Sequence, residues 1–299
     1  MINPLSDPLV ENVIIDNVAD VVRLEATQEG VAIVTINRPK RRNALNSLAV
    51  EGLTEVFETL QGASGVRVVF LRGAEGHFCA GADLTEMQSA LPDWTEADFR
   101  AAGESFAALL RAIEETPALT VALCEGAARG AGVGLAAACD ITLATAQATF
   151  GFPEVRLGLA PALSASPVAR AVGWREARAL FVTGQTIDAA YAARVGLVRE
   201  VLADAADLDR AMDRLIDWVM TSAPQAAAET KQMLREAEDR DEATKDQLAR
   251  RGAALRAGAE ARRRGGARGR RCFPGAAQAR LARLRTGRQG VSAPARRRR

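Results

Sequence analysis

The chain has 299 residues, and 39 Lys and Arg against 37 Asp and Glu give it a formal charge of +2. This average joins two unlike parts: no acidic residue follows Glu260, whereas 14 arginines do, and residues 1–261 alone keep 25 basic and 37 acidic side chains, a formal charge of −12. About 260 residues at 48% apolar composition can bury a large core, which excludes a small scaffold that depends on staples.

Cysteine and histidine content argues against metal and disulfide chemistry. The four cysteines, Cys79, Cys124, Cys139 and Cys272, form no CxxC motif, and the chain has a single histidine. We therefore expect reduced, buried thiols and no metal site. The N-terminus lacks a basic segment followed by an apolar run, and no stretch approaches 18 uncharged apolar residues, so the sequence predicts a cytoplasmic protein without a membrane span.

The first third of the chain predicts strands and one long helix. We interpret residues 1–20 as a loose leader. In chain order, the patterns then predict a hairpin of strands at 21–27 and 31–36, a helix after a cap at Ser47, and a strand buried on both faces at 66–71.

Strand and helix patterns then alternate, with a helix at 93–115, a strand at 119–123, a small-residue helix at 132–138 and a strand at 140–144. This alternation predicts a mostly parallel sheet with right-handed crossovers. Later patterns are helical, at 164–172, 175–182, 188–194, 208–220 and 224–256, with one strand at 197–202. We expect an α/β fold with a β/α core over 21–203 and a C-terminal helical region over 204–261.

Two glycine-rich segments follow predicted strands. The first is Phe78-Cys79-Ala80-Gly81-Ala82-Asp83-Leu84, and the second runs from Glu125 to Gly134 and opens a helix. Small residues at such turns let a ligand approach main-chain N–H groups, and the helix dipole adds positive potential. Two such turns side by side could hold one oxyanion. The alternative is that the small residues only permit close helix–sheet packing.

A third segment, from Phe150 to Pro161, places Glu154 among apolar residues and turn formers. Such surroundings raise the pKa of a carboxyl group towards a value suited to proton transfer. A lone glutamate in a loop is, as an alternative, simply solvated.

Together and in this order, the three segments make residues 20–260 resemble the enoyl-CoA hydratase/isomerase family, the crotonase superfamily. Further matching motifs are Ile36-Asn37-Arg38-Pro39, Asn43-Ala44-Leu45, Leu180-Phe181-Val182-Thr183-Gly184 and Ala193-Arg194-Val195-Gly196-Leu197-Val198. The resemblance implies a crotonase-like (ClpP/crotonase) fold with a ββα-superhelix core.

The resemblance also implies a site. Family members bind an acyl-coenzyme A and stabilise a thioester enolate with two main-chain N–H groups, which by position belong to Ala82 and Ala131. Ala80, Asp83 and Leu84 would line the adenosine end of the pocket, and Lys40, Arg41 or Arg42 would lie near the phosphates, although a solvated basic loop explains those cations equally well. Coenzyme A is part of the substrate here, and no separate cofactor or metal is implied.

Departures from the family pattern favour one reaction. Family hydratases use two glutamates, and the first falls at Gly134 while the second falls at Glu154. A single carboxylate above an oxyanion hole can still move a proton from the α-carbon to the γ-carbon of an enoyl thioester, as the family's isomerases do. Dienoyl-CoA isomerases and a dehalogenase branch place an aspartate where this chain has Ala162, so those activities are disfavoured.

Several other positions have a simpler interpretation. The family's Gly-Ala-Gly-Gly-Thr-Gln-Arg becomes Ala162-Leu163-Ser164-Ala165-Ser166-Pro167-Val168, and we interpret Ser164 and Ser166 as helix caps rather than contacts to the acyl group. His77 is interpreted as a surface loop residue. Packing explains Cys79 and Cys139, and it is preferred over a role in the acyl site for Trp94, Phe99 and Phe106.

The arginine-rich tail, 262–299, has three possible explanations. It could tether nucleic acid or an anionic membrane, it could be a disordered extension, or it could be the product of a shifted reading frame. Fourteen arginines without a lysine, among Gly, Ala and Pro, are typical of high-GC DNA translated in a wrong frame. In that case the codons of the gene would restore a Leu-Glu, basic, Pro and Trp ending in the shifted frame.

The sequence therefore predicts an acyl-CoA enzyme of fatty-acid or related metabolism in which Glu154 transfers the proton and isomerisation is favoured. An enoyl-CoA hydratase, which is a lyase, and an acyl-CoA binding protein with little turnover remain alternatives. The expected partners are an acyl-CoA thioester and, from the resemblance, further copies of the chain in a homotrimer or hexamer. Neither a membrane nor a nucleic acid is expected as a partner.

Overall fold

A computed structural model describes residues 12–17, 21–27, 29–90 and 95–238. The chain divides into two units, Met1–Glu236 and Ala237–Arg299. Only the first two residues of the second unit are among those described, so the predicted arginine tail at 262–299 and the helix pattern beyond residue 238 lie outside them.

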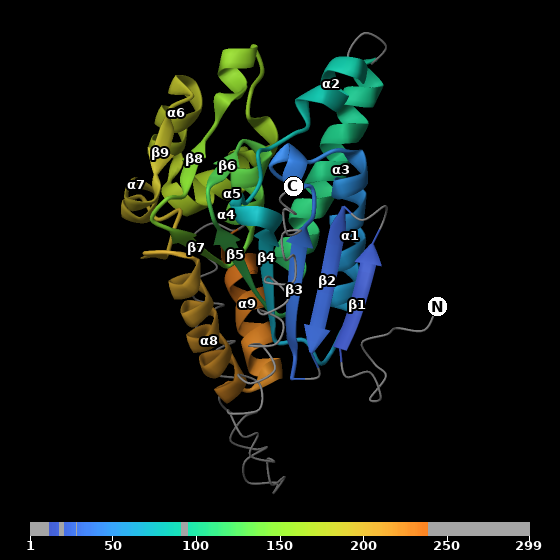
Figure 1. The fold of residues 1–299 in the computed structure, drawn as a ribbon, viewed down its shortest axis with the longest axis vertical. Coiled ribbons are helices and arrows are strands. Elements are labelled where there is room, and N and C mark those ends of the chain that lie inside the picture. The colour runs from blue at the N-terminus through green and yellow to red at the C-terminus, as the bar shows by residue number, and fades with distance from the viewer. Residues whose placement is uncertain (1–11, 18–20, 28, 91–94, 239–299) are drawn as a thin grey trace, which may run out of the picture. The chain divides into compact units, whose positions relative to one another are not determined.

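A seven-stranded sheet in the order β1-β2-β3-β4-β5-β7-β10 forms the centre of the first unit (Figure 1). Its first three strands pair antiparallel, and the pairs from β3 to β10 are parallel. The strands are β1 (Asn12–Asn17), β2 (Val22–Thr27), β3 (Val31–Ile36), β4 (Val68–Gly73), β5 (Leu119–Cys124), β7 (Ile141–Thr145) and β10 (Glu200–Leu202). The predicted hairpin and the mostly parallel sheet are confirmed.

The central strands are apolar without alternation because both faces of the sheet are covered. Four of the six residues of β4 are consecutive buried apolar side chains, Val68 to Leu71, and β5 has a similar run. Parallel strands covered on both sides have this composition. Helices α1 and α3 pack against each other behind the sheet in Figure 1.

Helix α2 was not predicted from the sequence, and the other described helices agree with the predicted patterns except at some ends. They are α1 (Ser47–Gln61), α2 (Leu84–Ala90), α3 (Glu96–Glu115), α4 (Ala131–Ala138), α5 (Ala162–Val172), α6 (Trp174–Thr183), α7 (Ala189–Arg194), α8 (Ala205–Thr221) and α9 (Pro224–Glu238). The predicted cap at Ser47 is wrong: Asn46 is the cap, and its side chain accepts a hydrogen bond from the N–H of Ala49.

Lys231 connects α9, the last described helix, to the central sheet. Lys231 of α9 pairs with Asp140 at 2.7 Å and donates to the carbonyl of Ala118 at 3.1 Å. Asp140 in turn accepts hydrogen bonds from the N–H and hydroxyl of Thr120. The helix is therefore held at the start of β5 and β7 by a polar cluster.

Two features of the sheets also differ from the sequence predictions. Residues 12–17, placed in the loose leader, form a strand at the edge of the sheet, in register with β2. A second sheet in the order β6-β8-β9 was not predicted, and its strands are β6 (Ala127–Arg129), β8 (Thr149–Gly151) and β9 (Thr186–Asp188). Three-residue strands are too short to leave a periodic signal.

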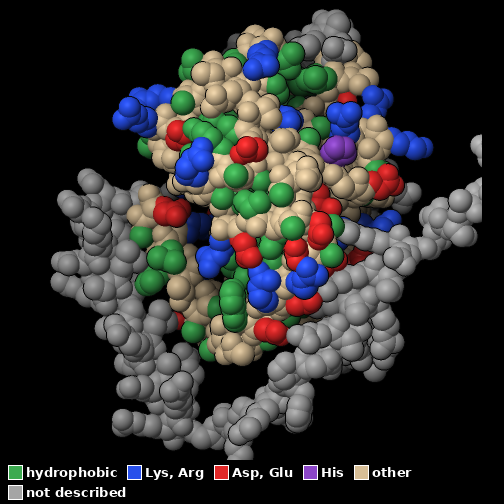
Figure 2. Space-filling view, turned by 60° about the vertical axis from the view of Figure 1, so that its left-hand side comes forward, with side chains coloured by type: hydrophobic (Ala, Val, Ile, Leu, Met, Phe, Trp, Pro, Cys, Tyr) green, Lys and Arg blue, Asp and Glu red, His purple; other side chains and the backbone are tan. Residues whose placement is uncertain are grey.

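Apolar side chains reach the surface around α5, α6 and α8. Leu163, Trp174, Val182 and Trp218 are all exposed. Figure 2 brings the side of the unit that carries α6 and α7 forward and shows apolar side chains there among Lys and Arg. Within the described part of the chain, no helix is both long enough and apolar enough to cross a bilayer.

Candidate active site

The two glycine-rich segments lie side by side. The N–H of Cys79 donates to the carbonyl of Ala127 at 3.1 Å, and the N–H of Arg129 donates back to the carbonyl of Cys79 at 2.9 Å. A Cβ at Gly81 would lie 2.6 Å from the carbonyl oxygen of Arg129 and 3.7 Å from the nitrogen of Ala131. Gly81 is therefore required for this close approach, in addition to its positive φ of 89°.

Main-chain N–H groups remain available at this junction. The neighbours of Ala82 bond to the strand-like segment at Leu45: the carbonyl of Gly81 accepts from it, and the N–H of Asp83 donates to it. The N–H of Ala82 itself forms no hydrogen bond among the described residues. Ala131 is the first residue of α4, where the N–H has no partner within the helix. Both predicted donors thus lie on adjacent segments with free N–H groups.

Glu154 is brought to the same junction by the second sheet. β6 and β8 are parallel neighbours, so the chain leaves both at one edge, and the N–H of Gly130 donates to the carbonyl of Gly151 at 2.9 Å. Glu154 follows in a 3₁₀ helix, Pro153–Leu157. A Cβ at Gly130 would lie only 2.3 Å from Oε1 of Glu154, so this carboxylate rests directly against the residue before Ala131.

The carboxylate of Glu154 is held in an unusual electrostatic state. Its Oε2 is buried and has no hydrogen-bond partner among the described residues. Burial raises the pKa of the Glu154 carboxyl above its ordinary value, and a backbone hydrogen bond only partly opposes this. A partly buried carboxylate oxygen without a partner lowers the stability of the folded protein. Such groups are concentrated at functional sites. The side chain as a whole is half-buried, so Glu154 is neither fully solvated nor fully enclosed.

Gly134 faces Ser164 across the site. A Cβ at Gly134 would lie 2.7 Å from Oγ of Ser164 and 3.1 Å from its Cβ, so a longer side chain at Gly134 requires Ser164 to move. The predicted caps at Ser164 and Ser166 are wrong. The N-cap of α5 is Pro161, Ser164 donates from inside the helix to the carbonyl of Gly130, and Ser166 accepts from Arg170.

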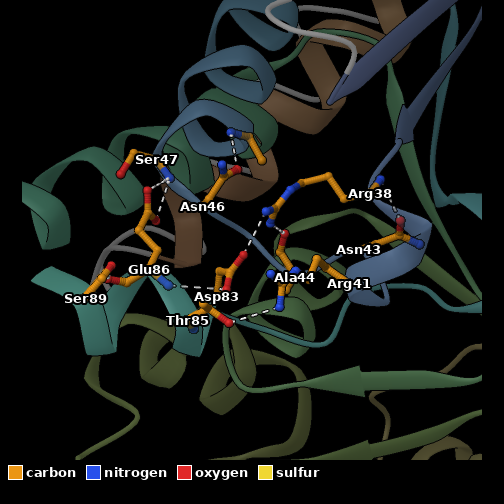
Figure 3. Close-up of polar contacts among 11 residues, drawn as sticks. Arg38, Arg41, Asn43, Ala44, Asn46, Ser47, Asp83, Thr85, Glu86 and Ser89 are labelled. Atoms are coloured by element: carbon orange, nitrogen blue, oxygen red, sulfur yellow. Dashed lines mark hydrogen bonds and ion pairs between the residues drawn. The ribbon is translucent and has the colours of Figure 1, made fainter.

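The predicted adenosine end of the pocket contains a polar network (Figure 3). Arg38 donates to the carboxylate of Asp83 at 2.8 Å and to the carbonyl of Ala44, and Asp83 also accepts from the N–H groups of Thr85 and Glu86 at the start of α2. The side chain of Asp83 is therefore buried and fully engaged. Burial acts to raise the pKa of its carboxyl group, but the hydrogen bonds and charge of Arg38 outweigh burial and hold that pKa below its ordinary value.

Replacing Asp83 by Asn is expected to lower the free energy of unfolding by about 2–4 kcal/mol at pH 7, because Arg38 would lose its buried counterion. Stabilisation from a lowered carboxyl pKa is present above the unfolded-state pKa of about 3.9 and is lost as the pH falls through the folded-state value. Urea unfolding should therefore show the two proteins converging below about pH 4. Asp98→Asn, at an exposed helix cap, is the control, and an equal loss there would contradict this role for Asp83.

The remaining predicted residues surround this network. Ala80 donates its N–H to the carbonyl of Arg42, and Leu84 is exposed as the first residue of α2. Lys40, Arg41 and Arg42 are exposed beside them, and Arg41 donates to the hydroxyl of Thr85 at 3.1 Å. The structure thus places the basic loop next to the first glycine-rich segment.

Other predicted roles resolve as packing. Cys79 and Cys139 are buried and Phe106 belongs to the core, whereas Trp94 and the side chain of Phe99 lie outside the described residues. The surface interpretation of His77 is only partly right, because the ring is half-buried and its Nδ1 accepts from the N–H of Ala127 at 3.4 Å. It supports the second glycine-rich segment.

Comparison with known proteins agrees with this geometry. The family model described as enoyl-CoA hydratase/isomerase matches residues 26–267, most of the chain. The chain belongs to the enoyl-CoA hydratase/isomerase family. Its crotonase-like fold, predicted from sequence, is confirmed by solved structures of that family.

Three proteins to which this chain is similar illustrate the relationship. A probable enoyl-CoA hydratase, EchA8 of Mycobacterium leprae, is 41% identical over 58% of this chain and 66% of its own length, so the match spans just under two thirds of that relative. AtuE of Pseudomonas aeruginosa is 39% identical over 78% of this chain and 90% of its own, with a TM-score of 0.74. A putative enoyl-CoA hydratase of Thermobifida fusca was solved in complex with acetoacetyl-CoA. It is 30% identical over 80% of this chain and 95% of its own, with a TM-score of 0.71.

Proposed function

We propose that this protein is an acyl-CoA enzyme that isomerises 3-enoyl thioesters to 2-enoyl thioesters. The observation that carries the proposal is the position of Glu154, whose half-buried side chain lies against Gly130, next to the free N–H of Ala131. A proton acceptor beside two main-chain donors is the arrangement that an enolate-forming reaction needs.

In this reaction Glu154 removes a proton from C2 of the substrate. The C–H electron pair moves into the conjugated system and places negative charge on the thioester oxygen, which the N–H groups of Ala82 and Ala131 stabilise. The protonated Glu154 then delivers the same proton to C4, and the double bond shifts from C3–C4 to C2–C3. Such preorganised donors contribute about 3–4 kcal/mol each to the transition state.

The surroundings of the site support an acyl-CoA substrate. Leu157, Leu159 and Leu163 are exposed apolar side chains on the segment that follows Glu154, a suitable lining for an acyl chain. Lys40, Arg41 and Arg42 present positive charge beside the first glycine-rich segment, where phosphate groups of coenzyme A would bind. We place the protein in the cytoplasm and expect a trimer or hexamer.

Gly134 is the reason for preferring isomerisation. Hydration in this family relies on a second carboxylate at this position, and here the side chain is absent and Ser164 occupies the adjoining space. Relatives that are named enoyl-CoA hydratases favour the second candidate, enoyl-CoA hydration. Loss of one of two cooperating acid–base groups lowers the rate by about 10²–10⁴-fold, which is the physical argument against it.

Incubation of the protein with 3-enoyl-CoA and, separately, with 2-enoyl-CoA tests the proposal. We expect chromatography to show 2-enoyl-CoA formed from the first substrate and little 3-hydroxyacyl-CoA formed from the second. Faster hydration than isomerisation would overturn the preference for isomerisation. Tight binding of both thioesters without turnover would identify an acyl-CoA binding protein instead.

A further inference from the structure

The hydroxyl group of Ser164 lies on the peptide unit that carries one of the proposed oxyanion donors. Its Oγ donates to the carbonyl oxygen of Gly130 at 3.1 Å. That carbonyl and the N–H of Ala131 belong to one planar amide, so a group that holds the carbonyl also fixes the direction of the N–H. Ser164 is 2% exposed, and water therefore does not compete for this contact.

We propose that Ser164 is a positioning residue, which orients and polarises the Gly130–Ala131 peptide so that the N–H of Ala131 stabilises the enolate. The inference rests on the proposed function, because that function assigns the donor to Ala131. Ser164 itself acts through this peptide and does not contact the reacting atoms.

The backbone at Gly130 explains why such a group is needed. Gly130 has φ 48° and ψ −113°, a conformation that only glycine adopts readily, and its ψ sets the direction of the peptide that follows. Among the described residues two groups donate to this carbonyl: the hydroxyl of Ser164, and the N–H of Gly134, which donates at 3.1 Å as the first hydrogen bond of α4. The side-chain bond therefore restrains a strained peptide from the side opposite to the ligand.

Hydrogen bonding to the carbonyl also strengthens the donor at the other end of the amide. An N–H whose carbonyl already accepts a hydrogen bond is a better donor, because each bond polarises the next, by about 10–30%. Applied to an oxyanion donor, this gain corresponds to about two- to eightfold in rate. The stronger donor stabilises the transition state, in which the thioester oxygen gains negative charge, and it hardly stabilises the bound neutral thioester.

Ser164 occupies this place because Gly134 leaves it open. The Oγ atom lies 2.7 Å from where a Cβ of residue 134 would be. A chain with a longer side chain at 134 could not hold the serine in the same position. The lack of a side chain at Gly134 and the position of the Ser164 hydroxyl therefore depend on each other through packing.

Three variants of the full-length protein test this role: Ser164→Ala, Ser164→Cys, and Ser166→Ala as a matched control. Ser166 lies on the same helix, but its hydroxyl contacts exposed Arg170. Ser164→Ala is expected to lower kcat for 3-enoyl-CoA about two- to eightfold with KM nearly unchanged. Ser164→Cys, whose S–H is a weak donor, should fall between wild type and Ala, and Ser166→Ala should match wild type.

A spectroscopic titration separates positioning from mere packing. Acetoacetyl-CoA absorbs in the near ultraviolet once it ionises to its enolate, so its absorbance in the complex reports how well the site stabilises that anion. In Ser164→Ala the pH at which bound acetoacetyl-CoA ionises should rise by about 0.3 to 0.9 unit, which is the same two- to eightfold effect. The affinity for saturated butanoyl-CoA, which forms no such enolate, should change less than about twofold.

The outcomes are distinguishable from failure of the proposed function. If wild type ionises acetoacetyl-CoA and Ser164→Ala does so at the same pH, the positioning role is refuted while the proposed function stands. A loss of butanoyl-CoA affinity equal to the change in ionisation would also refute it, because that pattern indicates general damage. If wild type binds neither thioester, both the proposed function and the role of Ser164 fail.

Discussion

Glu154→Gln is expected to lower kcat for enoyl-CoA isomerisation by about 10²–10⁴-fold, because the amide cannot accept the proton from C2. The same substitution is expected to increase the free energy of unfolding at neutral pH. In the wild type, folding forces a carboxylate with one unpartnered oxygen into a buried place, and an uncharged amide of the same shape relieves most of that cost. Steady-state assay and urea unfolding measure the two effects.

The pH dependence follows from the raised pKa of Glu154. A carboxyl group with a raised folded-state pKa destabilises the native protein as the pH rises from its unfolded pKa of about 4.3 to the folded value. The stability advantage of Glu154→Gln should therefore appear across that window and be complete above it. The acid limb of kcat/KM in the wild type should likewise lie above pH 4.3, since the base must be ionised.

Glu125→Gln is the matched control for both effects. Burial also raises the pKa of Glu125, but this side chain faces Arg72 at 3.8 Å and does not approach Gly130. Its substitution should leave kcat within about twofold of wild type. A Glu154→Gln protein that retains wild-type kcat would remove Glu154 from the mechanism.

Gly130→Ala is expected to abolish measurable isomerisation, a loss of at least about 10²-fold, and also to destabilise the protein. Its Cβ would overlap Oε1 of Glu154 at 2.3 Å, and its φ of 48° is unfavourable for any residue with a side chain. The methyl group therefore displaces the base and turns the peptide that carries the Ala131 N–H. One added methyl group would therefore displace both the base and the oxyanion donor.

Gly173→Ala separates backbone strain from displacement of the base. Gly173 joins α5 to α6 with φ 80°, and a Cβ there meets nothing within 4 Å. We expect it to lower the free energy of unfolding by an amount similar to the strain component at Gly130, about 1–2 kcal/mol, with kcat retained. Equal losses of kcat in the two alanine variants would show that strain alone accounts for Gly130→Ala.

Sequence patterns predicted the site elements well wherever long apolar runs exist. The runs at Val68–Leu71 and Val121–Cys124 identify strands because both faces of the sheet are covered. The three-residue strands of the second sheet leave no such signal, although they bring Glu154 to Gly130. Convergence of the three segments was therefore predictable only from the family resemblance.

The contacts of Ser164 and Asp83 could not be predicted from the sequence for a different reason. The replacement of glycine by Ser164 in a family motif was visible, but the direction of its hydroxyl towards Gly130 depends on how α5 packs against α4. Asp83 was expected to line the ligand pocket, and the structure shows it committed to Arg38 and the start of α2. Position in a motif indicates proximity to a site, whereas burial and partners determine what a side chain does there.

The packing of Gly134 against Ser164 makes a second glutamate at position 134 difficult to introduce. A glutamate gained at position 134 meets a serine that already fills the space, so that step alone is disfavoured by overlap. A glycine gained at position 164 gives up the hydrogen bond to Gly130 before any second carboxylate exists to compensate. A second glutamate at position 134 therefore requires changes at both positions together, because either substitution alone creates an overlap or removes a hydrogen bond.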